Sequence, residues 1–307
     1  MNISINSFPP NRCNSLSLAI FKECKPLIGV VHLPPLPGSP GYRRMRFPDI
    51  RGEVWGIDSI LEYALNQAKL YESIGFDGVI IENYGDKPYS VHASKGQIAS
   101  LAKIVSAITR ELSIPVGISI LRNAGYESII VTHVSGARFT RINSLCELRV
   151  SQEGILYPEA RRVARALQEL NIYEDLYLNR LLIMADINVK HSYPLHEESD
   201  ITNIVRDCVE RCGYPIYSII LTGSRTGEEP GYDTVEKVIG VVRELGVQLY
   251  VGSGVTHTNI SKYWSIADGF IVGTSIKVGG RTENPISEDR AIALAKLVKH
   301  YRSTIGC

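Results

Sequence analysis

The sequence predicts an α/β protein folded as a single (β/α)8 (TIM) barrel with a short N-terminal extension, and three observations support this fold. Roughly eight short apolar runs alternate with helix-length amphipathic stretches along the 307 residues, as a closed barrel requires. Several runs, such as LIGVV and YSIIL, are almost continuously apolar, which is typical of a parallel sheet covered on both faces. The last two runs each end in a glycine-bearing segment, and barrels of this kind bind phosphate there.

The expected strands are short runs rich in apolar and β-branched residues. In chain order they are Leu27 to Leu33, Gly78 to Asn83, Pro115 to Leu121, Ala137 to Asn143, Leu181 to Ile187, Ile216 to Thr222, Val247 to Gly252 and Asp268 to Gly273. The amphipathic stretches between them are expected crossover helices: Ile57 to Ile74, Gly96 to Leu112, Ala124 to Val134, Pro158 to Leu170, Glu197 to Cys212, Asp233 to Leu245, Thr258 to Ile266 and Ser287 to Tyr301.

These elements divide the chain into an N-terminal extension (1–25), the barrel (26–303) and a short tail (304–307). The extension is interpreted as a surface segment or as a segment that caps a strand. An open doubly wound sheet is the competing architecture. It is disfavoured because no GxGxxG motif follows the first strand and the phosphate signals follow the last two.

Composition and charge describe an ordinary globular protein that binds small molecules. Apolar residues make up 44% and charged residues 21%, which is enough to bury a large core, and the net charge of +1 argues against nucleic-acid partners. No apolar run approaches the roughly 18 residues of a membrane span. The six cysteines show no CxxC pair, so we expect reduced thiols and a cytoplasmic location. Cys208 and Cys212 lie four positions apart on an expected helix, and we expect them to be buried in packing rather than to bind a metal.

The two glycine-bearing segments, YVGSGVT (250–256) and FIVGTSIK (270–277), are the candidate phosphate site. A phosphate needs several backbone N–H donors that converge on it, and glycine lets the main chain approach without a Cβ in the way. With the glycine after the sixth strand, the predicted phosphate-binding residues are Gly223, Gly252, Ser253, Gly254, Gly273, Thr274 and Ser275.

Polar residues at the other strand ends are the candidates for chemistry, because catalytic groups of such barrels gather where the strands end. The predicted catalytic residues are His32, Glu82, Arg141, Asn143, Asp186, Lys190 and His191. Glu82 and Asp186 could act as general bases or Mg²⁺ ligands. An ion pair with Arg141 or Lys190 is the alternative for both carboxylates.

The basic candidates have more than one possible role. Lys190 could bind phosphate or carboxylate, act as an acid or form an imine, and the electrostatic role is the commonest for lysine. His32 and His191 could transfer protons near neutral pH or serve as hydrogen-bonded structural groups. The remaining histidines, His92, His133, His196, His257 and His300, are interpreted as structural. Asn83, Asn123, Asn143 and Thr222 could equally cap neighbouring loops or helices.

Three loops at the strand ends are candidate covers of the site. The proline-rich loop His32 to Tyr42 is expected to be stiff and ordered, because proline fixes φ and lowers the entropy lost on ordering. The loops Tyr84 to Lys95 and Gly223 to Tyr232 contain glycine and charge, and are interpreted either as mobile covers or as solvated surface.

Several motifs together resemble the BtpA/SgcQ family. They are KPLIGVVHLPPLPGSPGY, FDGVIIENYGDKPY, MADINVKHSYPL, LTGSRTG, YVGSGVTHTNI and ADGFIVGTSIKVGG, and they run in order from about Lys25 to Arg302. That family is named for a cyanobacterial photosystem I biogenesis protein, and the resemblance implies a barrel with a ribulose-phosphate-binding type of site. The family pattern tends toward an acidic residue after LRN, where this chain has Ala124.

The residues and the resemblance favour an enzyme that acts on a small phosphorylated, sugar-derived substrate by isomerase, epimerase or aldolase-type chemistry. A non-catalytic assembly or regulatory protein that retains the phosphate site is the first alternative, because fold does not determine function. A prenyl-phosphate transferase on the same fold is the second, and it would need an apolar groove beside the phosphate. Homo-oligomers are compatible with the sequence through apolar helix faces.

Overall fold

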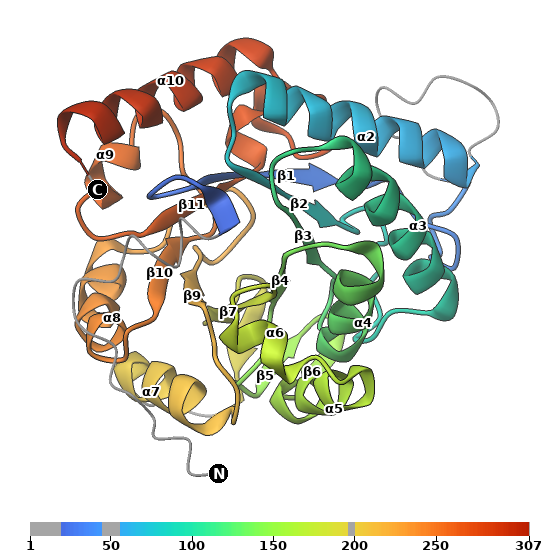
Figure 1. Cartoon of the computed structure of the whole chain (residues 1–307), viewed down its shortest axis with the longest axis horizontal. Coiled ribbons are helices and arrows are strands. Elements are labelled where there is room, and N and C mark those ends of the chain that lie inside the picture. Colours follow the sequence, from blue (N-terminus) through green and yellow to red (C-terminus); the bar gives the residue numbers. More distant parts are fainter. Residues whose placement is uncertain (1–19, 45–55, 196–199, 307) are drawn as a thin grey trace.

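The computed structural model describes residues 20–44, 56–195 and 200–306, and these form the predicted closed barrel of parallel strands (Figure 1). The strands pair in the order β1-β11-β10-β9-β7-β4-β3-β2. Each lies within a predicted run: β1 (Leu27–His32), β2 (Gly78–Glu82), β3 (Val116–Ser119), β4 (Phe139–Ile142), β7 (Leu182–Ile187), β9 (Ser218–Leu221), β10 (Gln248–Val251) and β11 (Gly269–Val272). The fold class is confirmed.

Helices surround the barrel and cover the outer face of its strands (Figure 1). They are α2 (Ile57–Ile74), α3 (Lys95–Glu111), α4 (Gly125–Ser135), α5 (Ala160–Leu170), α6 (Tyr173–Tyr177), α7 (Ile201–Arg211), α8 (Tyr232–Glu244), α9 (Ile260–Tyr263) and α10 (Glu288–Thr304). Local signals set their ends. Ser94 and Gln97 form a capping box that starts α3, and Gly75, at φ 97°, ends α2 in the left-handed conformation. Residues 196–199, with His196, lie outside the described part.

The barrel interior is apolar toward the amino ends of the strands and polar at their carboxyl ends. Side chains alternate along a strand, so one set points inward. That set forms a buried cluster with members such as Val30, Ile80, Phe139, Met184 and Tyr250. At the carboxyl ends the inward set turns polar, and neighbouring strands hold these residues in register: His32 lies opposite Glu82, Glu82 opposite Ser119, and Ser119 opposite Arg141.

Two residues of the N-terminal extension, Ile20 and Phe21, close the opposite end of the barrel. Ile20 and Phe21 are 5% and 3% exposed. The Phe21 ring packs edge-to-face on Phe139, the first residue of β4, at a centroid distance of 5.3 Å. This contact supports the capping interpretation for Ile20 and Phe21, while residues 1–19 lie outside the described part of the chain.

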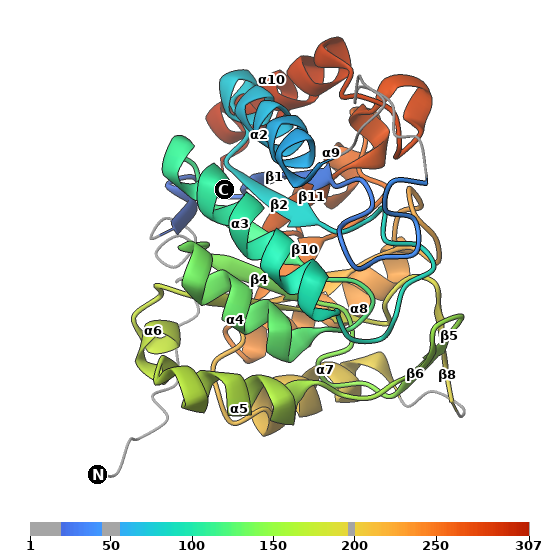
Figure 2. The same cartoon turned by 90° about the vertical axis from the view of Figure 1, so that its right-hand side faces the viewer.

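A small antiparallel sheet was not expected from the sequence. It consists of β6 (Gly154–Leu156), β5 (Arg149–Ser151) and β8 (Ser192–Pro194), in that order. Figure 2 shows it on the side toward which β1 and β2 point, beside the mouth of the barrel. Strands of three residues carry too little periodicity to be recognised, and β5 and β8 are brought together only by the folded barrel.

The structure corrects the prediction that the cysteines are reduced. Cys146, in the loop after β4, forms a disulfide with Cys208 of α7, with the two Cα atoms 5.2 Å apart. Cys212 is a buried free thiol, and its Sγ lies 3.5 Å from Sγ of Cys146. The sequence did not reveal the bond because 62 positions separate the partners. Among the described helices, none is both long and apolar enough to cross a membrane.

Candidate functional site

A pocket lies at the carboxyl ends of the barrel strands, and the space inside it, including open solvent, is about 360 Å³. Strand-end side chains and both glycine segments line it: Val30, His32, Glu82, Arg141, Lys190, Gly252, Ser253, Gly254, Val255, Val272, Gly273, Thr274 and Ser275. Most of the predicted site residues are therefore brought together. Asn143, Asp186, His191 and Gly223 are absent from this lining.

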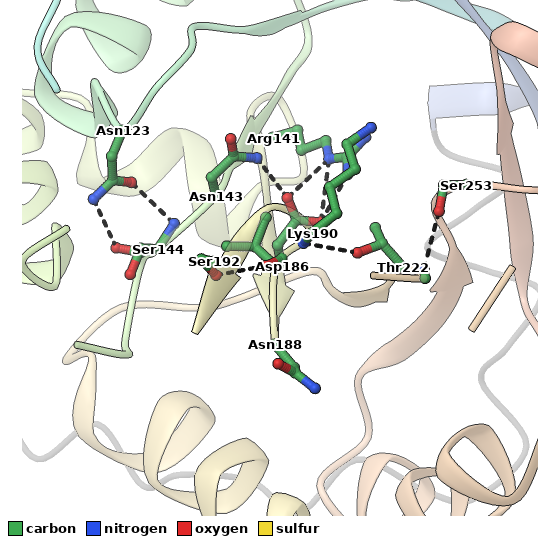
Figure 3. A network of polar contacts seen from close by, with 12 residues as sticks. Asn123, Arg141, Asn143, Ser144, Asp186, Asn188, Lys190, Ser192, Thr222 and Ser253 are labelled. Atoms are coloured by element: carbon green, nitrogen blue, oxygen red, sulfur yellow. Dashed lines mark hydrogen bonds and ion pairs between the residues drawn. The ribbon is translucent and has the colours of Figure 1, made fainter. Parts of the chain in front are cut away.

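Asp186 lies at the end of β7 and is fully buried beside the pocket. Arg141 Nε donates to Oδ1 and Oδ2 at 3.2 and 3.1 Å, and Arg141 Nη2 lies 3.0 Å from Oδ1. Asn143 Nδ2 donates to Oδ2 at 2.6 Å (Figure 3). Both carboxylate oxygens are thus occupied, so the ion-pair alternative fits Asp186 and the role of an open general base does not.

The Asp186 contacts also argue against a Mg²⁺ site formed by Glu82 and Asp186. Mg²⁺ needs free oxygen ligands, whereas the Asp186 oxygens hold a guanidinium. Burial acts to lower the pKa of Arg141, but the Asp186 and Glu82 carboxylates outweigh it and hold that pKa above its usual value. Arg141 therefore stays charged and keeps the Asp186 oxygens occupied.

Lys190 follows β7 and projects into the pocket near Arg141 (Figure 3). Its backbone is fixed: the N–H donates to Thr222 Oγ1 at 3.1 Å, and the carbonyl accepts from Arg122 Nη2 at 2.5 Å. No hydrogen bond or ion pair to Nζ is found among the described residues. Burial and the charge of Arg141 lower the pKa of Lys190 to about 8. The ammonium therefore carries an exchangeable proton near neutral pH.

His32 and Glu82 face each other on neighbouring strands. Both are 5% exposed, and Nε2 of His32 lies 3.9 Å from Oε1 of Glu82. Burial lowers the pKa of His32 well below its usual value, and the charges of Lys277 and Lys190 lower it further. The imidazole is consequently neutral at neutral pH and cannot form an ion pair with Glu82. Glu82 thus presents its carboxyl group to the pocket.

The two glycine segments bring main chain to the pocket wall. Gly254 has φ 69°, and a Cβ there would lie 2.1 Å from the amide nitrogen of Glu229. A Cβ on Gly273 would lie 2.6 Å from Cε1 of His32. In the described part of the chain, no acceptor is bonded to the amide groups of Ser253, Gly254, Thr274 and Ser275. These N–H groups border the pocket and can bind an anion.

The hydroxyl groups of Ser253 and Ser275 in this wall are hydrogen-bonded to backbone groups of neighbouring loops. Ser253 Oγ donates to Glu228 O at 2.6 Å and accepts from Gly223 N at 3.1 Å. Ser275 Oγ donates to Val255 O at 2.5 Å. In the described residues the hydroxyl groups of Ser253 and Ser275 are thus occupied, whereas their amides are available to an anion. The Gly223 N–H is occupied too, and its bond ties the loop 223–232 to the pocket wall.

His191 lies outside the pocket on the exposed side of the loop after β7. Its Nε2 is 2.8 Å from Thr226 Oγ1 and accepts from Thr226 N at 3.2 Å. Burial, followed by the charge of Lys190, lowers the pKa of His191. This placement fits the structural alternative, because the ring connects two loops and does not face the pocket.

Two residues that matter to the site were missed by sequence reasoning. Ser119 is 1% exposed, stands between Glu82 and Arg141 in register, and its Oγ has no partner among the described residues. Tyr84 packs edge-to-face on His32 at 5.1 Å and donates its hydroxyl proton to Glu283 Oε1 at 2.7 Å. The inward parity of β3 could have identified Ser119. No local signal connects Tyr84 to Glu283.

Fold and pocket together define the class: a (β/α)8 barrel whose site combines free amides of two glycine loops with charged side chains at strand ends. The BtpA family model matches residues 23–300, and the chain belongs to the BtpA family. An uncharacterized protein of Pyrococcus horikoshii is 40% identical over 91% of this chain and 97% of its own length. The photosystem I biogenesis protein BtpA of Synechocystis is 30% identical, over 89% and 88% of the two chains.

Solved structures with little sequence identity share the barrel. The 3-keto-L-gulonate-6-phosphate decarboxylase of Vibrio cholerae superposes with a TM-score of 0.52 at 13% identity, over 91% of this chain and 99% of that one. Phosphoribosyl anthranilate isomerase of Thermus thermophilus gives a TM-score of 0.50 at 13% identity, over 78% and 95%. At this identity the likeness shows the fold alone.

Proposed function

We propose that this protein is an enzyme that acts on a small phosphorylated, sugar-derived substrate by isomerase, epimerase or aldolase-type chemistry. One observation carries the proposal. The amide N–H groups of Ser253, Gly254, Thr274 and Ser275 have no acceptor among the described residues. They border the same pocket as Glu82 and Lys190. An anion site thus adjoins a carboxyl group and a lysine whose pKa is about 8.

In this proposal, different pocket residues position the substrate, accept a proton beside its carbonyl group and stabilise the resulting charge. The loop amides hold the phosphate and set the position of the carbon chain. Glu82 accepts a proton from the carbon next to the carbonyl, while Lys190 and Arg141 stabilise the negative charge that develops on the carbonyl oxygen. Asp186 does not touch the substrate; it keeps the Arg141 guanidinium in place through the ion pair at 3.0 Å.

The comparisons support this proposal through the shared fold and the names of two structural neighbours. Both structural neighbours above are named for phosphorylated substrates or for phosphoribosyl compounds. The Synechocystis relative, in contrast, is named for photosystem I biogenesis, which keeps the non-catalytic alternative as an outcome of the test. Prenyl transfer is not supported, because the pocket in the described residues is lined by polar and glycine residues with only three valines.

The test is a screen of phosphorylated aldoses, ketoses and keto acids for turnover, with Glu82→Gln and Lys190→Met as variants. We expect Glu82→Gln to lower kcat by about 10²- to 10⁴-fold and to leave inorganic phosphate binding intact, because the loop amides are untouched. Glu62→Gln, on the exposed face of α2, is the matched control. Ligand binding without turnover in the unmodified protein would favour the non-catalytic alternative.

A further inference from the structure

A second cluster of ligating side chains lies on the barrel rim, outside the pocket. It consists of His92 in the loop between β2 and α3, Glu127 in the first turn of α4, and Glu159 at the start of α5. Each contributes one potential ligand atom, and the three atoms lie within 4.8 Å of one another. Figure 2 shows α4 and α5 side by side. Three separate elements therefore converge on one point.

The two carboxylates are held in place from one side. Arg162 Nη2 donates to Glu127 Oε1 at 2.9 Å, and Arg162 Nε donates to Glu159 Oε2 at 3.0 Å. The amide of Tyr126 also donates to Glu159 Oε2, at 3.2 Å. One oxygen of each carboxylate is thus fixed by a donor, and two negative charges face one positive charge.

Among the described residues, no hydrogen-bond donor reaches the remaining oxygen of either carboxylate. Glu127 is only 9% exposed, and its Oε2 is buried without a hydrogen-bond partner among the described residues. Glu159, whose side chain is 2% exposed, has Oε1 3.9 Å from Nδ1 of His92. A buried carboxylate oxygen without a partner is costly, so this pair of oxygens beside an imidazole nitrogen is a candidate cation site.

We propose that His92, Glu127 and Glu159 bind a divalent transition-metal ion such as Zn²⁺. One imidazole nitrogen and two carboxylate oxygens are ligands that Zn²⁺ accepts, with bonds of about 2.0–2.2 Å. Arg162 and the Tyr126 amide are the outer partners that orient such ligands. The metal ion offsets the two carboxylate charges and joins the loop after β2 to the starts of α4 and α5. His92, interpreted from the sequence as structural, becomes a ligand.

The test is calorimetric titration of the chelator-treated protein with Zn²⁺, comparing His92→Ala with His133→Ala. His133 is an exposed histidine of α4 without a ligating neighbour in the described cluster, so it is the matched control. We expect His92→Ala to bind Zn²⁺ at least about 10-fold more weakly and His133→Ala to bind like the unmodified protein. Zinc binding elsewhere on the protein contributes equally to both variants.

Thermal unfolding gives a second readout. Zn²⁺ should raise the Tm of the unmodified protein and of His133→Ala, because a ligand that binds only the folded state stabilises it, and this rise should shrink in His92→Ala and Glu127→Gln. His92 is exposed, so its replacement leaves the fold intact. Equal Zn²⁺ affinity in His92→Ala and His133→Ala would overturn the proposal.

Discussion

At the residue scale, the candidate site depends on a buried ion pair. Arg141 lines the pocket, and Asp186 lies beneath it with both oxygens occupied. The sequence predicted that both residues lie at strand ends. It gave an ion pair of Asp186 with Arg141 or Lys190 only as the alternative to a general base or Mg²⁺ ligand. Arg141 and Asp186 lie 45 positions apart, and the adjacency of β4 and β7 brings them together.

Asp186→Asn should lower the free energy of unfolding by about 3–5 kcal/mol, because it removes the carboxylate that is paired with the buried Arg141 guanidinium. Urea titration followed by circular dichroism measures the change. Asp207→Asn, in an exposed pair on α7, is the control and should change stability by less than about 1 kcal/mol. The double variant Asp186→Asn with Arg141→Met should recover part of the loss. A loss for Asp186→Asn no greater than for the control would contradict the assignment.

Lys190 makes a pH-dependent contribution to stability. Its pKa is about 8 in the fold against an ordinary value of 10.5. Below pH 8 the buried ammonium destabilises the folded state. Between pH 8 and 10.5 the unfolded chain binds more protons than the folded chain, so the contribution of Lys190 to the unfolding free energy rises with pH.

Lys190→Met should therefore be more stable than the unmodified protein at pH 7, and the gap should shrink as the pH rises toward 10.5. Chemical unfolding at a series of pH values measures the gap. Lys296→Met, on the exposed face of α10, is the control and should give a gap independent of pH over this range. A gap that stays constant for Lys190→Met would show that its pKa is unshifted.

At the element scale, the two glycine loops bring main-chain amides to the pocket wall because of their backbone geometry. Both were predicted from the sequence, including their place after the last two barrel strands. Which atoms face the pocket was not predictable, because the Ser253 and Ser275 hydroxyls bond to carbonyls of other loops. The short sheet of β5, β6 and β8 was missed for a similar reason, since its pairing is decided by loops far apart in the sequence.

Gly254→Ala should weaken the binding of inorganic phosphate and lower the unfolding free energy by more than about 1 kcal/mol, because a side chain at this positive φ is strained. Its Cβ would lie 2.1 Å from the Glu229 nitrogen. Gly240→Ala in α8 is the control, because nothing lies within 4 Å of its Cβ position. It should stabilise the helix by about 0.5–1 kcal/mol. Unchanged phosphate binding in Gly254→Ala would contradict the role of this loop.

At the scale of the whole molecule, Phe21 closes one end of the barrel, and the pocket opens at the other end. The eight-stranded fold and its membership of the BtpA family extend over nearly all of the chain. Phe21 precedes the first strand and packs on Phe139 of β4. The end of the N-terminal extension is therefore part of the core.

Phe21→Ala should lower the unfolding free energy by about 3–5 kcal/mol, as for other buried phenylalanines. Urea unfolding measures the loss, with Tyr177→Ala as the control because Tyr177 is 59% exposed. An effect of Phe21→Ala as small as that of Tyr177→Ala would mean that the barrel end is closed without this ring.

The sequence by itself determined the order of the barrel strands and their crossover helices, the barrel class, the family and the strand ends at which the pocket lies. These properties follow from local patterns: apolar runs, helical periodicity, glycines and motifs within a few residues. Only the tertiary structure decided that Asp186 holds Arg141, that Cys146 bonds Cys208, and that Glu159 approaches His92. Such contacts join residues 45 to 67 positions apart, and their existence depends on which strands and loops the closed barrel places side by side.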